Sequence, residues 1–533
     1  MNDDANAGID RHTSQVAADP VAETTSGQLR GVDEAGISAF RGIPYGASTA
    51  GRNRFLPPQP PLPWAGVRDA SSYQGHAPQA VDGASRRPEL ADFSGAPDTT
   101  PESEDCLTLN LWTPGIGAGK RPVMVWFHGG AFSYGSANSL RTQGNSLCRR
   151  GDVVVVTVNQ RLNIFGHLYL ADIGGAEFSD SGNAGTLDMV AALRWVRDNI
   201  ARFGGDPANV TIFGESGGGG KVSTLLAMPA AQGLFHRAII QSGATVRLIA
   251  KDRANRLAEA VLKTLGLTAR QLGDLQMVPV AKMLAAIGPA SKAIGPTDHK
   301  LFDRYDFGPV VDGKTVPNQP FDPVAPAISE HIPLMIGDMK DEMAIFLAPD
   351  DKIWNRTLTE SEMHGRVMAV AGAATDRVIA LYKRLHPETS PAELLIAILT
   401  DSNFRIRSLT LAQRKAAQNR APVFMYAFEW ETPVHGGRLK APHAMDVPFT
   451  FDTLEFVGST DRGPAAHALA ARMSTTWTAF ARTGSPDNPA IPPWPAYNAQ
   501  TRDTMILNTT WSIAADPNKE TRLLWQEISN AQA

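Results

Sequence analysis

The 533-residue sequence has few cysteines and no long apolar run. Its two cysteines, Cys106 and Cys148, allow at most one disulfide, which excludes a small scaffold held together by disulfides. No run approaches the roughly 18 apolar residues that a membrane span needs. The 54 acidic and 50 basic residues are interspersed, so the basic stripe typical of nucleic-acid binding is also missing. We therefore expect neither a membrane span nor a nucleic-acid partner.

Residues 1–20 are polar and acidic and lack the basic and apolar segments of a secretory signal. We expect a disordered tail over these residues and, unless a leader has been removed from the sequence, a cytoplasmic protein. No group of His, Cys, Asp and Glu shows the spacing of metal ligands. The sequence thus predicts no metal and no cofactor. A monomer and a homodimer are both compatible with it.

Short β-branched runs bounded by turn residues predict strands that are buried on both faces, as in a parallel sheet. The strongest cover 122–127, 152–159 and 209–213, and weaker candidates cover 237–243, 332–338 and 423–430. Between the second and third, apolar residues recur at helical spacing over 186–203, before two glycines. Strands alternating with helices predict an α/β fold with a large, mostly parallel central sheet. We expect one domain over 21–533.

One serine stands in the pattern G-x-S-x-G, within "TIFGESGGGGKVSTLL" (211–226). Ser216 follows a predicted strand and precedes a helical pattern that starts at about Lys221. This setting is typical of a nucleophile elbow, in which a strained turn exposes the serine and glycines let the backbones cross. The alternative is a glycine-rich turn whose serine only caps the helix. Close helix packing is the one reason we find for the extra Gly219 and Gly220.

An activated serine needs a base and preorganised donors for the oxyanion. The N–H of Gly217 supplies one donor directly. A second source is expected after an early strand, where "VMVWFHGGAF" (123–132) places Gly130 and Ala131. Small residues there let the backbone approach a substrate closely, although a plain structural turn is the alternative.

These motifs, with "SEDCLTLNLW" (103–112), "GNAGTLDMVAALRWVRDNIARFGGDPANVTIFGES" (182–216) and "LFHRAIIQSG" (234–243), resemble the type-B carboxylesterase/lipase family. The resemblance runs from about residue 27 to about 489. It implies an α/β-hydrolase fold in which helical insertions form the cap and gorge. It also implies a catalytic acid at Glu342, in "GDMKDEMAIF" (337–346), and a catalytic histidine at His443, in "KAPHAMDVPFTF" (440–451).

Without the resemblance, the residues do not decide which side chains serve as the catalytic acid and base. Twelve histidines are available, His435 in "PVHGG" being the nearest rival, and Asp338 or Asp341 rival Glu342. The resemblance selects the chain order Ser216, Glu342, His443, which this fold requires.

The resemblance implies a serine carboxylesterase that hydrolyses esters of small to medium apolar acids and alcohols through an acyl-enzyme, without cofactor. Amide or carbamate hydrolysis by the same triad is an alternative, and a non-catalytic adhesion-type protein a more distant one. The loop reads G-G-A where the family more often has G-G-G, which implies tolerance of bulky alcohols. Gly217 replaces the family's usual alanine, and Ala77 replaces the cysteine that would pair with Cys106. Lys221 and His167 are unusual and receive no role.

Overall fold

A computed structural model describes residues 19–80, 87–295 and 306–532. The predicted tail over 1–20 therefore lies outside the described residues, except for its last two. An eleven-stranded sheet runs through the described chain in the order β16-β15-β14-β13-β10-β9-β7-β8-β6-β4-β3. Its strands are β3 (Val32–Asp33), β4 (Ser38–Pro44), β6 (Thr108–Thr113), β7 (Gly117–Phe127), β8 (Val154–Val158), β9 (Phe203–Glu215), β10 (Arg237–Gln241), β13 (Leu334–Met339), β14 (Val423–Phe428), β15 (Asp503–Leu507) and β16 (Ser512–Ala515).

The middle of the sheet is parallel, from β8 through β7, β9, β10, β13 and β14 to β15. Antiparallel pairs close both edges, with β6, β4 and β3 on one side and β16 on the other. Two small sheets flank it: β1 (Val21–Thr24), β2 (Gly27–Arg30) and β5 (Val67–Asp69) in one, β11 (Ile249–Ala250) and β12 (Val310–Val311) in the other. The predicted mostly parallel sheet is confirmed, and each of the six predicted strands corresponds to a strand of it.

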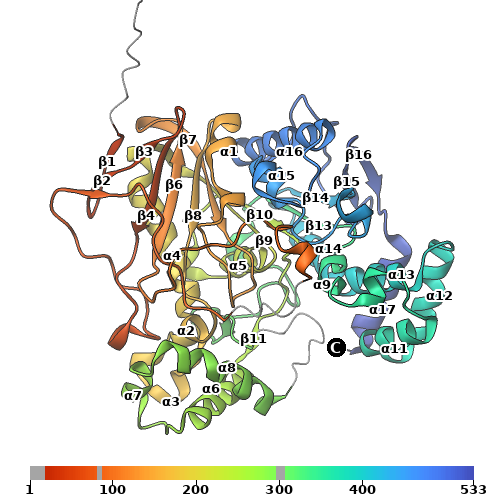
Figure 1. The fold of residues 1–533 in the computed structure, drawn as a ribbon, viewed down its shortest axis with the longest axis horizontal. Helices are drawn as coiled ribbons and strands as arrows, with labels where there is room; N and C mark the ends of the chain where they lie inside the picture. The colour runs from red at the N-terminus through yellow and green to blue at the C-terminus, as the bar shows by residue number, and fades with distance from the viewer. Residues whose placement is uncertain (1–18, 81–86, 296–305, 533) are drawn as a thin grey trace, which may run out of the picture.

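Helices cover both faces of the sheet, as Figure 1 shows. Side chains of α1 (Asn145–Gly151), α15 (Val447–Phe451) and α16 (Pro464–Thr483) share one apolar core with Met124 and Trp126 of β7. Side chains of α4 (Ala184–Asn199), α5 (Gly217–Leu225) and α14 (Ile406–Ala416) share the other core with Val125 and Phe127. Successive residues of β7 thus enter opposite cores, because side chains alternate along a strand. This explains the uninterrupted apolar run at 122–127.

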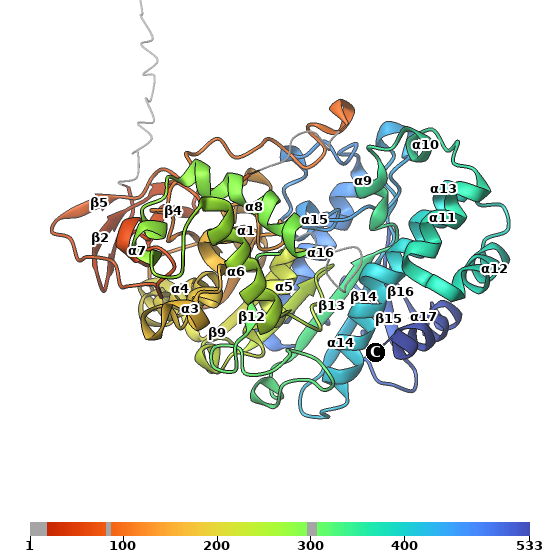
Figure 2. The ribbon, with the colours of Figure 1, turned by 90° about the horizontal axis from the view of Figure 1, so that it is seen from below.

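Two helical groups are inserted between strands, as the resemblance implies. Helices α6–α8 lie between β10 and β13, and α9–α13 between β13 and β14. Figures 1 and 2 show α6–α8 (green) and α11–α13 (teal) on opposite sides of the molecule. The remaining helices are α2 (Asn163–His167), α3 (Ala171–Gly174), α6 (Lys251–Leu265), α7 (Leu272–Gln276), α8 (Val280–Ile294), α9 (Met343–Leu347), α10 (Asp351–Trp354), α11 (Glu360–Ala371), α12 (Thr375–Leu385), α13 (Pro391–Thr400) and α17 (Lys519–Gln532). Among the described residues, no helix is long and apolar enough to span a bilayer.

Two predicted boundaries were wrong. Helix α4 ends at Asn199 and β9 begins at Phe203, so the predicted helix over 186–203 is too long. Helix α5 begins at Gly217, four residues before the predicted start at about Lys221. Glycine is a poor helix former, so a run of glycines does not announce a helix in the sequence. Here close contacts with neighbouring backbone compensate for that weak propensity.

Candidate active site

Ser216 lies on a strained turn between β9 and α5. Its φ of 56° and ψ of −122° are rare for a residue with a side chain. The turn is held by the Ser216 N–H, which donates to Gln241 O at 2.8 Å. The hydroxyl makes no capping hydrogen bond to α5, so the helix-cap alternative was wrong. Ser216 is only partly buried, although it directly follows a buried strand end.

The glycines after Ser216 give neighbouring backbone room to approach. An added Cβ would fall closer than 3.0 Å, a distance that real Cβ atoms essentially never show. The closest contacts would be 2.1 Å from Gly217 to Ala131 Cα, 2.0 Å from Gly218 to Phe127 O, and 2.8 Å from Gly219 to Gly243 Cα. At Gly220 the nearest atom is a side-chain oxygen at 3.0 Å. Close backbone packing of α5 therefore explains Gly219, whereas Gly220 meets only side-chain atoms.

His443 and Glu342 lie together although 101 positions separate them in the chain. The His443 Nδ1 and Glu342 Oε2 atoms are 2.5 Å apart, and both residues are buried. The other carboxylate oxygen of Glu342 accepts from Met339 N at 2.8 Å. The acid therefore holds the imidazole while its own position is fixed by the backbone at the end of β13.

A second carboxylate faces the opposite side of the imidazole. Glu215, which directly precedes Ser216, is buried, and its Oε1 lies 3.0 Å from His443 Nε2. Burial alone would lower the pKa of His443, but the charges and hydrogen bonds of Glu215 and Glu342 outweigh it and raise the pKa well above the usual value. In this arrangement the imidazolium is stabilised from both sides.

The rival candidates for the catalytic base and acid contact other groups. His435 packs against the rings of Phe93 and Trp354, with centroids 6.4 and 6.1 Å away. Asp338 is 3.3 Å from Arg405 and Asp341 accepts from a backbone N–H, whereas Glu342 holds His443.

The loop after β7 lies directly against the turn that carries Ser216. A Cβ added at Gly129 would be 3.0 Å from Glu215 Oε2 and 3.5 Å from Ser216 Cβ. Ala131 has a φ of 52° and contacts Gly217 through its backbone. Among the hydrogen bonds found in the described ranges, none uses the N–H of Gly130 or Ala131. These donors are therefore available beside the serine.

Two phenylalanine rings flank the candidate base. Phe346 and Phe404 lie 4.9 and 5.0 Å from the His443 ring, and their own centroids are 6.2 Å apart. Phe346 is 42% exposed, which is unusual for so large an apolar side chain beside a buried charge. The rings form an apolar, partly open wall next to the imidazole.

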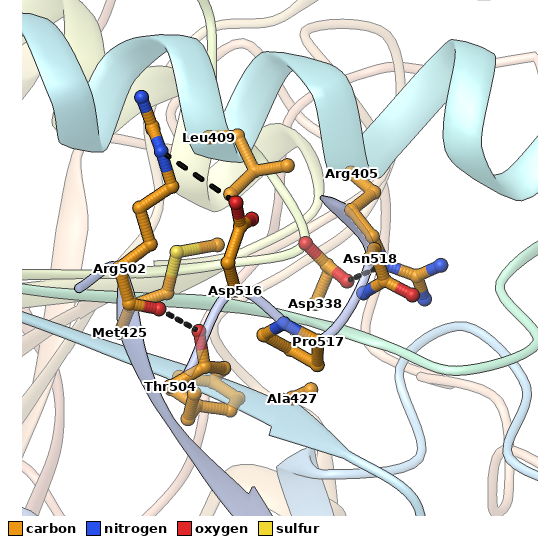
Figure 3. Close-up of a pocket in the computed structure, with 11 residues that line it drawn as sticks. Asp338, Arg405, Leu409, Met425, Ala427, Arg502, Thr504, Asp516, Pro517 and Asn518 are labelled. Atoms are coloured by element: carbon orange, nitrogen blue, oxygen red, sulfur yellow. Dashed lines mark hydrogen bonds and ion pairs between the residues drawn. The ribbon is translucent and has the colours of Figure 1, made fainter. Parts of the chain in front are cut away.

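A small cavity lies beside Asp338, four residues before Glu342, and is also lined by Arg405, Arg502 and Asp516 among others (Figure 3). Its volume of about 10 Å³ matches one water molecule and is far too small for an ester. Burial raises the pKa of Asp338 to about 7, with Arg405 opposing and the Glu342 charge adding to the rise. The cavity therefore belongs to the support of the acid loop, not to a substrate.

The Carboxylesterase family model matches residues 18–525. The chain belongs to this family. It is 37% identical over 508 residues to the para-nitrobenzyl esterase of Bacillus subtilis, covering 94% of this chain and 97% of that protein. It is 33% identical over 503 residues to the phenmedipham hydrolase of Pseudarthrobacter oxydans, covering 92% and 95%. The structure of the Geobacillus stearothermophilus carboxylesterase EST55 superposes with a TM-score of 0.81 at 37% identity, over 95% of this chain and all of that one.

Membership confirms the α/β-hydrolase fold and identifies the protein as a serine carboxylesterase, which acts on small-molecule esters. The non-catalytic adhesion-type alternative is thereby set aside. The sequence reasoning missed three residues of the site: Glu215, Phe346 and Phe404. The sequence held an indication of Glu215, because a carboxylate at the end of a strand that is buried on both faces is rarely buried without a partner. The two phenylalanines had none, since their helices meet only in the folded chain.

Proposed function

We propose that Ser216 is the nucleophile, His443 the general base and Glu342 the acid of this carboxylesterase. The observation that carries the proposal is the 2.5 Å contact between His443 Nδ1 and Glu342 Oε2, beside a serine on a strained turn. Glu342 fixes the tautomer of the imidazole and stabilises the imidazolium. Neutral His443 takes the Ser216 proton through Nε2, the atom that in the resting structure faces Glu215. Partial rotation of the ring is then needed, so that unprotonated Nε2 turns from Glu215 to accept from the Ser216 hydroxyl.

The Ser216 oxygen attacks the ester carbonyl, and the carbonyl oxygen takes the negative charge. The N–H groups of Gly130, Ala131 and Gly217 hold this oxyanion. The intermediate collapses as His443 protonates the departing alcohol, which leaves an acyl-enzyme. Water, deprotonated by the same base, then releases the acid and restores the serine.

The substrates we infer are esters of small to medium apolar acids and alcohols. Phe346 and Phe404 support this, because they place apolar surface beside the group that protonates the leaving alcohol. Tolerance of bulky alcohols remains part of the proposal and rests on the G-G-A loop. Comparing n-butyl acetate with tert-butyl acetate tests it directly.

Ester hydrolysis is proposed over carbamate or amide hydrolysis by the same residues. Two relatives carry names that describe an esterase and a hydrolase of phenmedipham. Matched aryl esters, carbamates and anilides would rank the three activities by kcat/KM. An anilide turned over as fast as its ester would overturn this choice.

The deciding experiment is the intact mass of the folded protein after treatment with a small fluorophosphonate, followed by peptide mapping. We expect one adduct, on Ser216, and none in Ser216→Ala, whose turnover should fall by about 10⁴-fold or more. Labelling at another serine would overturn the nucleophile. A normal rate for His443→Ala together with a dead His435→Ala would overturn the base.

We also propose a cytoplasmic location. Cys106 and Cys148 are buried free thiols, and burial raises the pKa of both well above the usual value. Unpaired, unreactive thiols are typical of proteins in a reducing compartment. Fractionation of the native host would test this.

A further inference from the structure

Lys221 is a lysine buried beneath the candidate active site. It lies on α5, five residues after Ser216, and is only 1% exposed. Burying an ammonium group is unfavourable unless the group is paired or hydrogen-bonded. No carboxylate in the described part of the chain lies within ion-pair distance of its Nζ, although the charge of Glu215 acts on it through space.

The amine is used to bind the oxyanion loop. Lys221 Nζ donates to His128 O at 2.7 Å and lies 5.8 Å from the centre of the Phe132 ring. His128 follows directly after β7 and begins the loop that contains Gly130 and Ala131. The hydrogen bond therefore joins the loop to the helix that begins at Gly217.

The other side of His128 is also fixed. Its Nδ1 lies 2.8 Å from Gly129 O, and its Nε2 lies 2.8 Å from the side-chain nitrogen of Gln160. Burial lowers the pKa of His128, and the charge of Lys221 lowers it further, so the ring is neutral. The neutral tautomer with its proton on Nδ1 donates to Gly129 O and accepts at Nε2 from Gln160, which satisfies both contacts. Lys221 holds the carbonyl group of the same residue.

The geometry points to Lys221 as a positioning residue that sets the oxyanion donors of the loop against the donor of the helix. This inference rests on the proposed function, in which Gly130, Ala131 and Gly217 share one oxyanion. These three N–H groups come from two segments that are far apart in the sequence. The side chain of Lys221, on α5, hydrogen-bonds the loop after β7 and so joins the two segments.

A role in positioning predicts a specific kinetic signature. A displacement of about 1 Å in a catalytic group costs about 10²-fold in rate, and loss of one oxyanion donor costs about 10²- to 10³-fold. Lys221→Met keeps an unbranched side chain, one atom shorter, and removes its donor. We expect kcat for 4-nitrophenyl butyrate to fall about 10- to 100-fold while KM stays nearly constant. Affinity for a trifluoromethyl ketone, whose adduct carries an oxyanion, should fall by the same factor.

Lys415 provides a matched control. It is also 1% exposed, and its Nζ donates to two carbonyl groups, Ser329 O at 2.7 Å and Glu330 O at 2.8 Å. It lies on α14, and neither of these carbonyls belongs to the proposed site. Lys415→Met should lower the melting temperature comparably and leave kcat and trifluoromethyl ketone affinity unchanged.

Lys221→Gln is the conservative variant, because its amide can donate but reaches one bond less far. It should recover part of the lost kcat and guards against a Met variant that does not fold. The inference is overturned if folded Lys221→Met or Lys221→Gln keeps wild-type kcat and ketone affinity, or if Lys415→Met shows the same kinetic loss. Fluorophosphonate labelling of the wild-type protein separates the two failures: without an adduct on Ser216 the proposed function fails, and with one only the role of Lys221 does.

Discussion

Replacing Gly217 by alanine should disable the oxyanion site through a purely steric effect. The new Cβ would lie 2.1 Å from Ala131 Cα and 2.2 Å from Ala131 N. The shortest contacts of real Cβ atoms are about 3.0 Å, so the loop and helix must separate by roughly 1 Å. Such a misplacement costs about 10²-fold in rate, or about 2.7 kcal/mol of transition-state stabilisation.

The assay is kcat/KM for 4-nitrophenyl butyrate, together with the affinity for a trifluoromethyl ketone. Both should fall by about 10²-fold in Gly217→Ala. Gly365→Ala is the control, because it makes the same change within helix α11, where an added Cβ meets nothing within 4 Å. That variant should keep wild-type kinetics and gain slightly in stability.

A second substitution tests the reasoning more severely. Ala131 adopts a φ of 52°, which glycine accepts without strain, so Ala131→Gly alone should be nearly neutral. When Ala131→Gly is combined with Gly217→Ala, the more flexible loop can shift its backbone away from the new methyl group and recover much of the activity. The steric account would be refuted if Gly217→Ala retained wild-type kcat/KM. It would equally be refuted if the double variant were no more active than Gly217→Ala alone.

Further predictions concern protonation and stability. Activity requires neutral His443, so kcat/KM should be lost as the pH falls through the raised pKa of this residue. Glu215→Gln removes one of the two carboxylates that face the imidazole and should move this acid limb of the pH profile to lower pH. An unmoved limb would contradict the electrostatic role of Glu215. Asp188→Asn should cost about 3–5 kcal/mol of unfolding free energy in urea, because it leaves Arg161 charged at 2% exposure without its partner. Glu527→Gln, in an exposed ion pair, should leave the urea midpoint unchanged, and equal losses in the two variants would count against the first estimate.

The nucleophile could be predicted from the sequence because all its determinants are local. A strand, a glycine, Ser216 and another glycine stand within a few residues of one another, and the turn follows from them. The oxyanion loop is nearly as local, since "HGGA" directly follows an apolar strand. The pairing of parallel strands β7 and β9 then brings the two segments together at one edge of the sheet.

The catalytic acid and base could not be predicted from local sequence patterns. Glu342 and His443 follow β13 and β14, and their meeting depends on loops whose course no local pattern specifies. Only the resemblance to known esterases selected them from their rivals. The role of Lys221 was missed for a different reason: a lysine on a helix is usually solvated, and its burial depends on how β7 and α5 pack.

The buried charges around Ser216 balance one another, and this explains why Lys221 is tolerated. Glu215 and Glu342 face the imidazolium of His443, and Glu215 also raises the pKa of Lys221 against the lowering by burial, to a final value of about 7. Removing Glu215 therefore withdraws support from two cations at once, whereas removing Lys221 leaves Glu215 more strongly engaged with His443.

The effects of substituting groups that are coupled in this way are not additive. We therefore expect the rate losses of Glu215→Gln and Lys221→Met to be clearly non-additive in the double variant, whereas Lys415→Met combined with Glu215→Gln should be additive. Additivity of the first pair would show that the two charges act independently and would leave the burial of Lys221 to its hydrogen bond alone.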